Sequence, residues 1–427
     1  MHIVIIILFI SLAHGVARAD DSLLTTLSKS NDGTWRVHYE SSEPISRIEF
    51  QRGPSQSTHQ SPNRSRAARW QVNEAFQIYV EGEREYLKRV DNAAFTSVLA
   101  ELTPTYIALD KDYAPFSPFS DGGMLIHSGR FFACPEQCTD ADTHWSMAIQ
   151  LPADEDVIVN GQRYQGSASW QDSDSGQKLY VGAAEPQDDG NFISVIDPGL
   201  PESLRNLMAV NLPQFMAFFA ERLDQPQTKP QLFASYSTTN DGRYGHQGGV
   251  LPNQVFMHWY GFVDESLAEP ILWFFAHEAA HLYQKQAFSN QPAEAWLHEG
   301  SAELFAGLAM EQLGQGQGML GDTLNRARAE CSEGMGEDTS FHQAVAINSR
   351  LHYSCGLALF AAMHHDLQSQ HQSIFALWQA YSNAIDSGQL ASESVFLEVA
   401  EDYLSPTAFE RLTDFLSGAS SPTAYMW

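Results

Sequence analysis

Hydrophobic and polar positions alternate in short runs along the first part of the chain. Such runs cover 34–40, 45–51, 76–80, 145–151, 157–159 and 178–181, with Gly, Asn and Asp clusters between them. Alternation with period two is typical of strands that bury one face, and these turn residues commonly separate strands. The pattern predicts a β-rich, sandwich-like domain over residues 20–191.

The pattern changes after about residue 192. Runs at 192–196, 231–236 and 255–260 still read as strands, but a long amphipathic helix is predicted at 201–223. From residue 270 onward the apolar residues follow helical spacing, and Gly-rich stretches interrupt them. We therefore expect a helix-rich domain over 192–427 and an α+β fold class for the chain.

The first nineteen residues have the features of an export signal. An apolar core at 3–13 precedes Ala17-Arg18-Ala19, a small-x-small pattern that ends just before Asp20. The core is too short to span a bilayer well. We expect residues 1–19 to be a signal peptide and the protein to be periplasmic or secreted. An uncleaved anchor is the alternative, because the segment before the core has no Lys.

Charge and cysteine content narrow the class of protein further. The chain has 24 Lys and Arg against 52 Asp and Glu, a net charge of −28. Such a field repels nucleic acid and anionic membranes, so we expect neither nucleic-acid binding nor stable membrane association after signal cleavage. Four cysteines fit an oxidising compartment. We expect Cys134–Cys138 and Cys331–Cys355 disulfides, with other pairings or buried thiols as alternatives.

A candidate metal site lies in the helical half. His277 and His281 flank Glu278 in the pattern HExxH, within an apolar run that predicts a buried helix beginning near Pro270. Residues four apart share one helix face, so both imidazoles can bind one ion. Glu278 projects differently, which suits contact with a water molecule. Buried polar side chains need partners, and a metal supplies one to each of them.

A second predicted helix, at about 292–310, offers the remaining groups. Glu299 is the expected third ligand, and Glu303, one turn later, is the expected acceptor that orients a ligand imidazole. Two His and one carboxylate leave a fourth position open, as in catalytic zinc sites. The sequence thus predicts one catalytic zinc ion.

The order of these motifs resembles the gluzincin metallopeptidases, and most closely the aminopeptidase-N family. The matching segments are HExxH at 277–281, Trp-Leu-His-Glu-Gly at 296–300 and Tyr-Ser-Cys-Gly at 353–356. The spacing from His281 to Glu299 is one residue shorter than is usual in the family. The resemblance covers about 192–367 and implies a thermolysin-like fold for the helical half. It also implies that Tyr353 donates a hydrogen bond to the developing oxyanion.

One segment departs from the family pattern. Aminopeptidases of this family have Gly-x-Met-Glu-Asn before the zinc helix, and its Glu binds the free amino group of the substrate. The corresponding stretch is 249–253, Gly-Val-Leu-Pro-Asn, with Pro252 at the position of the Glu. We expect Gly249, Val250 and Asn253 to line the cleft as an edge strand. Asp264 or Glu265 is the alternative amine anchor.

These observations predict an exported zinc metallopeptidase that hydrolyses peptides or proteins, with Glu278 as general base. Loss of the amine-binding Glu favours an endopeptidase or oligopeptidase. One alternative is an aminopeptidase with a different amine anchor. The other is a non-catalytic, exported binding or chaperone-like protein that keeps a metal site. The sequence sets no oligomeric state.

Overall fold

The computed structural model describes residues 23–52, 65–107, 113–139, 141–188, 192–223, 229–239, 242–284, 291–335 and 340–418. The expected signal peptide, 1–19, lies outside the described residues. The chain forms two compact units, one of residues 1–103, 129–152 and 167–174, the other of 104–128, 153–166 and 175–427. Segments 104–128, 153–166 and 175–191, which we expected in the N-terminal domain, thus belong to the second unit.

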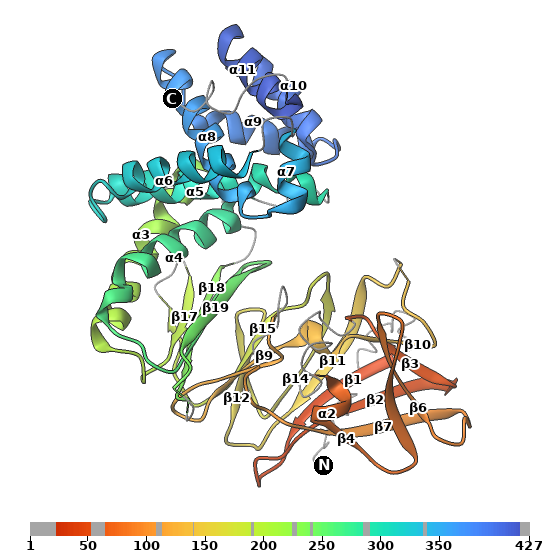
Figure 1. Ribbon diagram of the computed structural model, residues 1–427. Helices are drawn as coiled ribbons and strands as arrows, with labels where there is room; N and C mark the ends of the chain where they lie inside the picture. Colours follow the sequence, from red (N-terminus) through yellow and green to blue (C-terminus); the bar gives the residue numbers. More distant parts are fainter. Residues whose placement is uncertain are drawn as a thin grey trace, which may run out of the picture. The chain divides into compact units, whose positions relative to one another are not determined.

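The first unit consists of two sheets with strand orders β14-β11-β1-β2-β7-β4 and β10-β3-β6-β5 (Figure 1). In β2, Trp35, Val37 and Tyr39 are buried and their neighbours are more exposed, as period-two alternation requires. The elements of this unit are β1 Leu23–Lys29, β2 Trp35–Ile45, β3 Arg47–Phe50, α2 Arg66–Arg69, β4 Trp70–Val72, β5 Phe76–Glu81, β6 Arg84–Arg89, β7 Phe95–Leu102, β10 Ala133–Pro135, β11 His144–Gln150 and β14 Ser167–Ser173. A 3-10 turn, η2 Ser128–Phe131, precedes β10.

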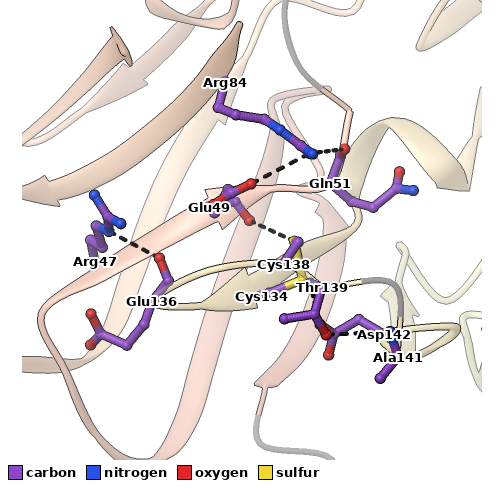
Figure 2. Close-up of a disulfide and its surroundings, with 10 residues drawn as sticks. All are labelled: Arg47, Glu49, Gln51, Arg84, Cys134, Glu136, Cys138, Thr139, Ala141 and Asp142. Atoms are coloured by element: carbon purple, nitrogen blue, oxygen red, sulfur yellow. Dashed lines mark hydrogen bonds and ion pairs between the residues drawn. A yellow bond between two sulfur atoms is a disulfide. The ribbon is translucent and has the colours of Figure 1, made fainter. Parts of the chain in front are cut away.

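Figure 2 shows the disulfide of this unit, at the edge of the four-stranded sheet. Cys134 lies opposite Glu49 in the antiparallel pair β10–β3, and a disulfide joins it to Cys138. Glu49 is buried, and its Oε1 lies 3.4 Å from Arg84 Nη1. The Cys134–Cys138 disulfide and the Cys331–Cys355 disulfide of the second unit confirm both expected bridges.

The second unit contains two five-stranded sheets, of orders β13-β12-β15-β9-β8 and β16-β17-β18-β20-β19. In the second sheet β17, β18 and β20 run parallel, and β19 is an antiparallel edge strand. The strands are β8 Phe116–Pro118, β9 Met124–His127, β12 Asp156–Val159, β13 Gln162–Gln165, β15 Lys178–Gly182, β16 Gln187–Asp188, β17 Ile193–Ile196, β18 Gln231–Ser237, β19 Gly245–Leu251 and β20 Gln254–Tyr260.

Helices make up most of the rest of the second unit. They are α3 Glu202–Arg222, α4 Ala268–Tyr283, α5 Trp296–Gln312, α6 Met319–Gly334, α7 Phe341–Ile347, α8 Leu351–Ser369, α9 Ile374–Asp386, α10 Glu393–Tyr403 and α11 Pro406–Ser417, with 3-10 turns η3 Glu265–Leu267 and η4 Pro292–Glu294. The fully buried Trp296 packs against Phe341, Phe360 and Phe396 in their shared core. Among the described residues, no helix is both long and apolar enough to cross a membrane. The predicted α+β class, a β-rich half followed by a helix-rich half, is confirmed.

Candidate metal centre and active site

Helix α4 carries three polar side chains in its buried last two turns. His277, Glu278 and His281 are 6%, 9% and 6% exposed. We had expected the helix to begin near Pro270. It begins at Ala268, so Pro270 is its third residue. Proline is tolerated there because amides of the first turn have no intrahelical acceptor. The two histidines are one turn apart and their ring centroids lie 4.6 Å apart.

Helix α5 brings Glu299 to the two imidazoles. Glu299 Oε2 lies 3.2 Å from His277 Nε2 and 3.3 Å from His281 Nε2, and the two nitrogens are 3.0 Å apart. Donor atoms about 2.0–2.1 Å from a tetrahedral zinc ion are about 3.3 Å from one another. The three observed separations therefore match the edges of one face of a zinc tetrahedron, and these residues fit the ion.

The far nitrogen of each imidazole faces a side-chain oxygen, and that of His281 is hydrogen-bonded to it. His277 Nδ1 lies 3.4 Å from Glu303 Oε1, and Trp273 Nε1 donates to Glu303 Oε2 at 2.7 Å. His281 Nδ1 lies 2.6 Å from the amide oxygen of Gln284, which is fully buried. An Nδ1–H bonded to such an acceptor leaves Nε2 unprotonated and able to bind a metal. Glu303 thus lies beside His277 Nδ1, and its role in orienting that ring stays a prediction.

Gln284 is a residue of the site that we did not expect from the sequence. Its amide nitrogen donates to the backbone oxygen of His298 and, at 2.7 Å, to Ser301 Oγ, so α5 holds the amide in place. Gln284 follows His281 by three residues in the same predicted helical run, and this spacing could have identified it. His298, which follows Leu297 in the motif, places Nε2 3.5 Å from Glu299 Oε1.

The environment sets the proton affinities of the carboxyl groups. Burial raises the pKa of Glu299, but its contacts with His281 and His277 outweigh this and hold that pKa well below its usual range. Burial also raises the pKa of Glu278, and the nearby His277 and His281 offset it only in part. A carboxylate with a raised pKa is a better proton acceptor, which suits a general base.

Tyr353 completes the group of expected catalytic residues. It lies in the first turn of α8, and its ring stacks on His277 with centroids 5.9 Å apart. Burial, followed by the charges of Glu299 and Glu278, raises the pKa of Tyr353, so the phenol stays protonated and can donate. The residue remains 42% exposed and so is open to a ligand.

Two glycines of the motifs explain how Tyr353 comes close to the candidate metal ligands. Gly300 of α5 and Gly356 of α8 meet where the helices cross, and a Cβ on Gly300 would lie 2.4 Å from the backbone of Gly356. Helix α8 is also bonded to α6 through Cys331–Cys355, two residues after Tyr353. The close helix packing therefore places Tyr353 beside the residues of α4 and α5.

These residues open into a cavity of about 710 Å³ within the second unit. Gly248, Gly249 and Val250 of the edge strand β19 line it, together with Tyr113, whose hydroxyl donates to Val250 O at 3.1 Å. Asn253 does not line it. That residue lies in the turn between β19 and β20, with a φ of +58°.

Comparisons with known proteins place this architecture in a fold class. No family model matches the sequence, and no curated protein matches it either. Solved structures of M1 zinc metallopeptidases share its fold over nearly the whole chain.

The M1 zinc metallopeptidase of Deinococcus radiodurans has 15% sequence identity with a TM-score of 0.51, covering 93% of this chain and 92% of that one. A mutant of the Deinococcus radiodurans enzyme bound to a Tyr-Ser-Ala substrate has 14% identity and a TM-score of 0.53, with 93% of each chain covered. Native yeast LTA4 hydrolase has 14% identity and a TM-score of 0.54, over 92% of this chain and 66% of that one.

Proposed function

We propose that this chain is a zinc-dependent peptidase. The observation that carries the proposal is the triangle of His277 Nε2, His281 Nε2 and Glu299 Oε2, with edges of 3.0–3.3 Å, beside a buried Glu278. The cavity that contains it is bordered by an edge strand, which can bind a peptide backbone by strand addition. The fold shared with solved zinc metallopeptidases supports the same function.

His277, His281 and Glu299 would hold one zinc ion, which when bound lowers the pKa of a water ligand and polarises a carbonyl group. Glu278 then accepts the proton of the attacking water at its carboxylate and passes it to the leaving amine. The Tyr353 hydroxyl donates to the carbonyl oxygen as negative charge develops there. Glu303 and Gln284 keep the two imidazoles in the tautomer that presents Nε2.

We further propose endopeptidase or oligopeptidase specificity. The described acidic residues that line the cavity are Glu278, Glu299 and Glu303, all at the metal site, and Glu330 of α6. Strand β19 adds no acid, and by the sequence resemblance Pro252 corresponds to the amine-binding Glu of the aminopeptidase-N family. Neither Asp264 nor Glu265 lines the cavity, which weakens the case for either as a replacement anchor.

Paired peptides test this specificity. Metal-loaded protein should cleave a fluorogenic peptide whose N-terminus is blocked as well as its free counterpart, and chelation should abolish both reactions. Cleavage of the free peptide alone would instead indicate an aminopeptidase with another amine anchor. If neither peptide is cleaved although zinc binds stoichiometrically, the binding-protein alternative is favoured.

We propose that the protein is exported, with cleavage after residue 19. Two disulfides among the described residues support an oxidising compartment. Mass spectrometry of the protein expressed with its own N-terminus should find a mature chain that begins at Asp20. An intact N-terminus in the membrane fraction would instead support the uncleaved anchor.

A further inference from the structure

Two arginines line the cavity. Arg326 of α6 and Arg350, the residue before α8, line it, and they are the only Lys or Arg among its described lining residues. Strand β19 contributes Gly248, Gly249 and Val250 to the lining, and these residues carry no charge. The described acidic lining residues are Glu278, Glu299 and Glu303 at the candidate metal site and Glu330 of α6, so the two guanidinium groups are what the lining offers to a ligand carboxylate away from that site.

Arg350 lies close to the reaction centre along its helix. It precedes Tyr353 by three residues, so both side chains lie on one face, within about one helical turn of 5.4 Å. The first turn of α8 contains no acidic residue, and the positive end of the helix dipole adds to the charge of Arg350. An anion held there would lie within a few peptide residues of a bond positioned beside Tyr353.

The contacts of the two arginines within the chain are weak. Arg350 Nη2 is 3.9 Å from Glu330 Oε2, and these side chains are 80% and 50% exposed, so this pair contributes little stability. Arg326 Nη2 donates to Thr323 Oγ1 at 3.1 Å. A guanidinium group has five donors in a planar fork that matches both oxygens of a carboxylate. Neither contact is a bidentate pair of this kind. A carboxylate of a ligand would form one.

We propose that Arg350 and Arg326 bind a carboxylate of the peptide substrate, within a few residues of the scissile bond. The inference rests on the proposed peptidase function and names its substrate class: short peptides with a nearby C-terminal carboxylate, or peptides with an acidic side chain there. A C-terminal carboxylate belongs to the leaving fragment, so these arginines anchor that fragment. This anchoring agrees with the absence of an acid on β19, since the substrate is held by its carboxyl end and its amino end needs no anchor.

Three peptides of one sequence separate the two sources of carboxylate: a C-terminal acid, the corresponding amide, and an amide with Glu in place of Gln near the cleaved bond. The wild-type kcat/KM should favour a carboxylate-bearing peptide over the neutral amide by about 10- to 100-fold, the range of a charge-assisted hydrogen bond. Arg350→Gln and Arg326→Gln should each lose most of this preference. Arg328→Gln is the matched control, because Arg328 lies on α6 but does not line the cavity.

Glu330→Gln should act in the opposite direction. Removal of this negative charge beside Arg350 should raise the preference for the carboxylate by about two- to threefold, as expected for an exposed pair. A preference for the acid peptide identifies the terminal carboxylate, and a preference for the Glu amide identifies a side chain. Equal cleavage of all three peptides, or a preference that persists in the double arginine variant, would overturn the inference.

A binding measurement separates this inference from the proposed function. Calorimetry with the Glu278→Gln protein, which cannot turn over substrate under the proposed mechanism, should show tighter binding of the acid peptide than of the amide. Adding Arg350→Gln should remove that difference. If no peptide is cleaved by the wild type but this difference is seen, peptide hydrolysis fails and the carboxylate site stands. If binding does not discriminate, the carboxylate site fails.

Discussion

Each imidazole of the candidate metal site has a side-chain oxygen beside its far nitrogen. Glu303, which accepts from Trp273, lies 3.4 Å from His277 Nδ1, and Gln284 is hydrogen-bonded to His281 Nδ1. Because these acceptors select the tautomer, both Nε2 atoms face Glu299 Oε2 without rearrangement. The preorganised triangle is the basis of the expected zinc affinity.

Glu303→Gln should weaken zinc binding by about 10- to 100-fold, the usual effect of losing an outer carboxylate. The amide keeps the size of the side chain but removes the charge that orients the His277 ring. Competition with a chromophoric chelator measures the affinity directly. Glu311→Gln, an exposed change on the same helix α5, is the control and should leave the affinity unchanged. Equal affinities for both variants would contradict the role of Glu303.

The sequence reveals those site residues whose relations are local or belong to a recognised motif. His277 and His281 follow from their four-residue spacing on one predicted helix, and Glu299 from the motif around it. Arg326 and Arg350 could not be predicted, because they reach the cavity only through the packing of α6 and α8. That packing depends on contacts between residues distant in sequence, which local patterns do not encode.

At the scale of elements, the crossing of α5 and α8 joins the two halves of the site. It is set by Gly300 and Gly356, whose missing side chains allow the backbones to meet. Glu299 is adjacent to the first glycine, and Tyr353 lies one turn before the second. The separation of these helices therefore decides whether Tyr353, the proposed oxyanion donor, reaches the proposed metal position.

Gly300→Ala should destabilise the protein by about 1–3 kcal/mol and reduce turnover, since its Cβ would lie 2.4 Å from backbone atoms of Gly356. Gly321→Ala is the matched control, because this glycine of α6 has nothing within 4 Å of its Cβ position. Alanine there should be neutral or stabilise by up to about 1 kcal/mol. Urea unfolding compares the two. An unchanged Gly300→Ala variant would show that the contact does not set the helix distance.

The two disulfides should contribute unequally. Cys331–Cys355 closes a separation of 24 residues and Cys134–Cys138 one of 4, so chain entropy predicts losses of about 3.5 and about 2 kcal/mol on replacing each pair with alanine. Removal of the first bond should also lower turnover, because it lies two residues from Tyr353. Chemical denaturation and peptide cleavage of the two double variants test both statements. A larger loss of unfolding free energy on removing Cys134–Cys138 than on removing Cys331–Cys355 would contradict this prediction.

At the scale of the whole chain, local sequence patterns predicted where strands and helices lie better than which strands pair with one another. The strand at β20 and the helix α4 lie close to their predicted ranges. By contrast, β1 pairs with β11, with Leu24 opposite Ser146, and β15 pairs with β9. The partners in both pairs are far apart in the sequence. A period-two pattern shows which face of a strand is buried but not which strand lies beside it, so the sheet orders had to come from the structure.

Stability should depend on pH through the buried His258 of β20. Burial, with a smaller contribution from Lys178, lowers the pKa of His258 to about 3, and its ring lies 2.8 Å from Ser235 Oγ. Between about pH 6.5 and 3 the unfolded chain binds a proton that the folded chain does not. The free energy of unfolding therefore falls with decreasing pH, by up to about 1.4 kcal/mol per unit from this group.

Urea unfolding at pH 7 and pH 4.5 tests this contribution. His258→Asn should lower stability at neutral pH but lose less on acidification than the wild type, because its side chain does not titrate. An equal loss in both proteins would mean that His258 contributes nothing to the pH dependence.

Zinc-dependent hydrolysis with Glu278 as the base is the central claim, and one comparison tests it most directly. Zinc content and cleavage of an N-terminally blocked peptide should be measured together for the wild type and Glu278→Gln. Both proteins should bind one zinc ion, since the three ligands remain, and the variant should lose about 10²- to 10⁴-fold in turnover. Wild-type turnover in a zinc-loaded Glu278→Gln variant, or no zinc in either protein, would contradict the account.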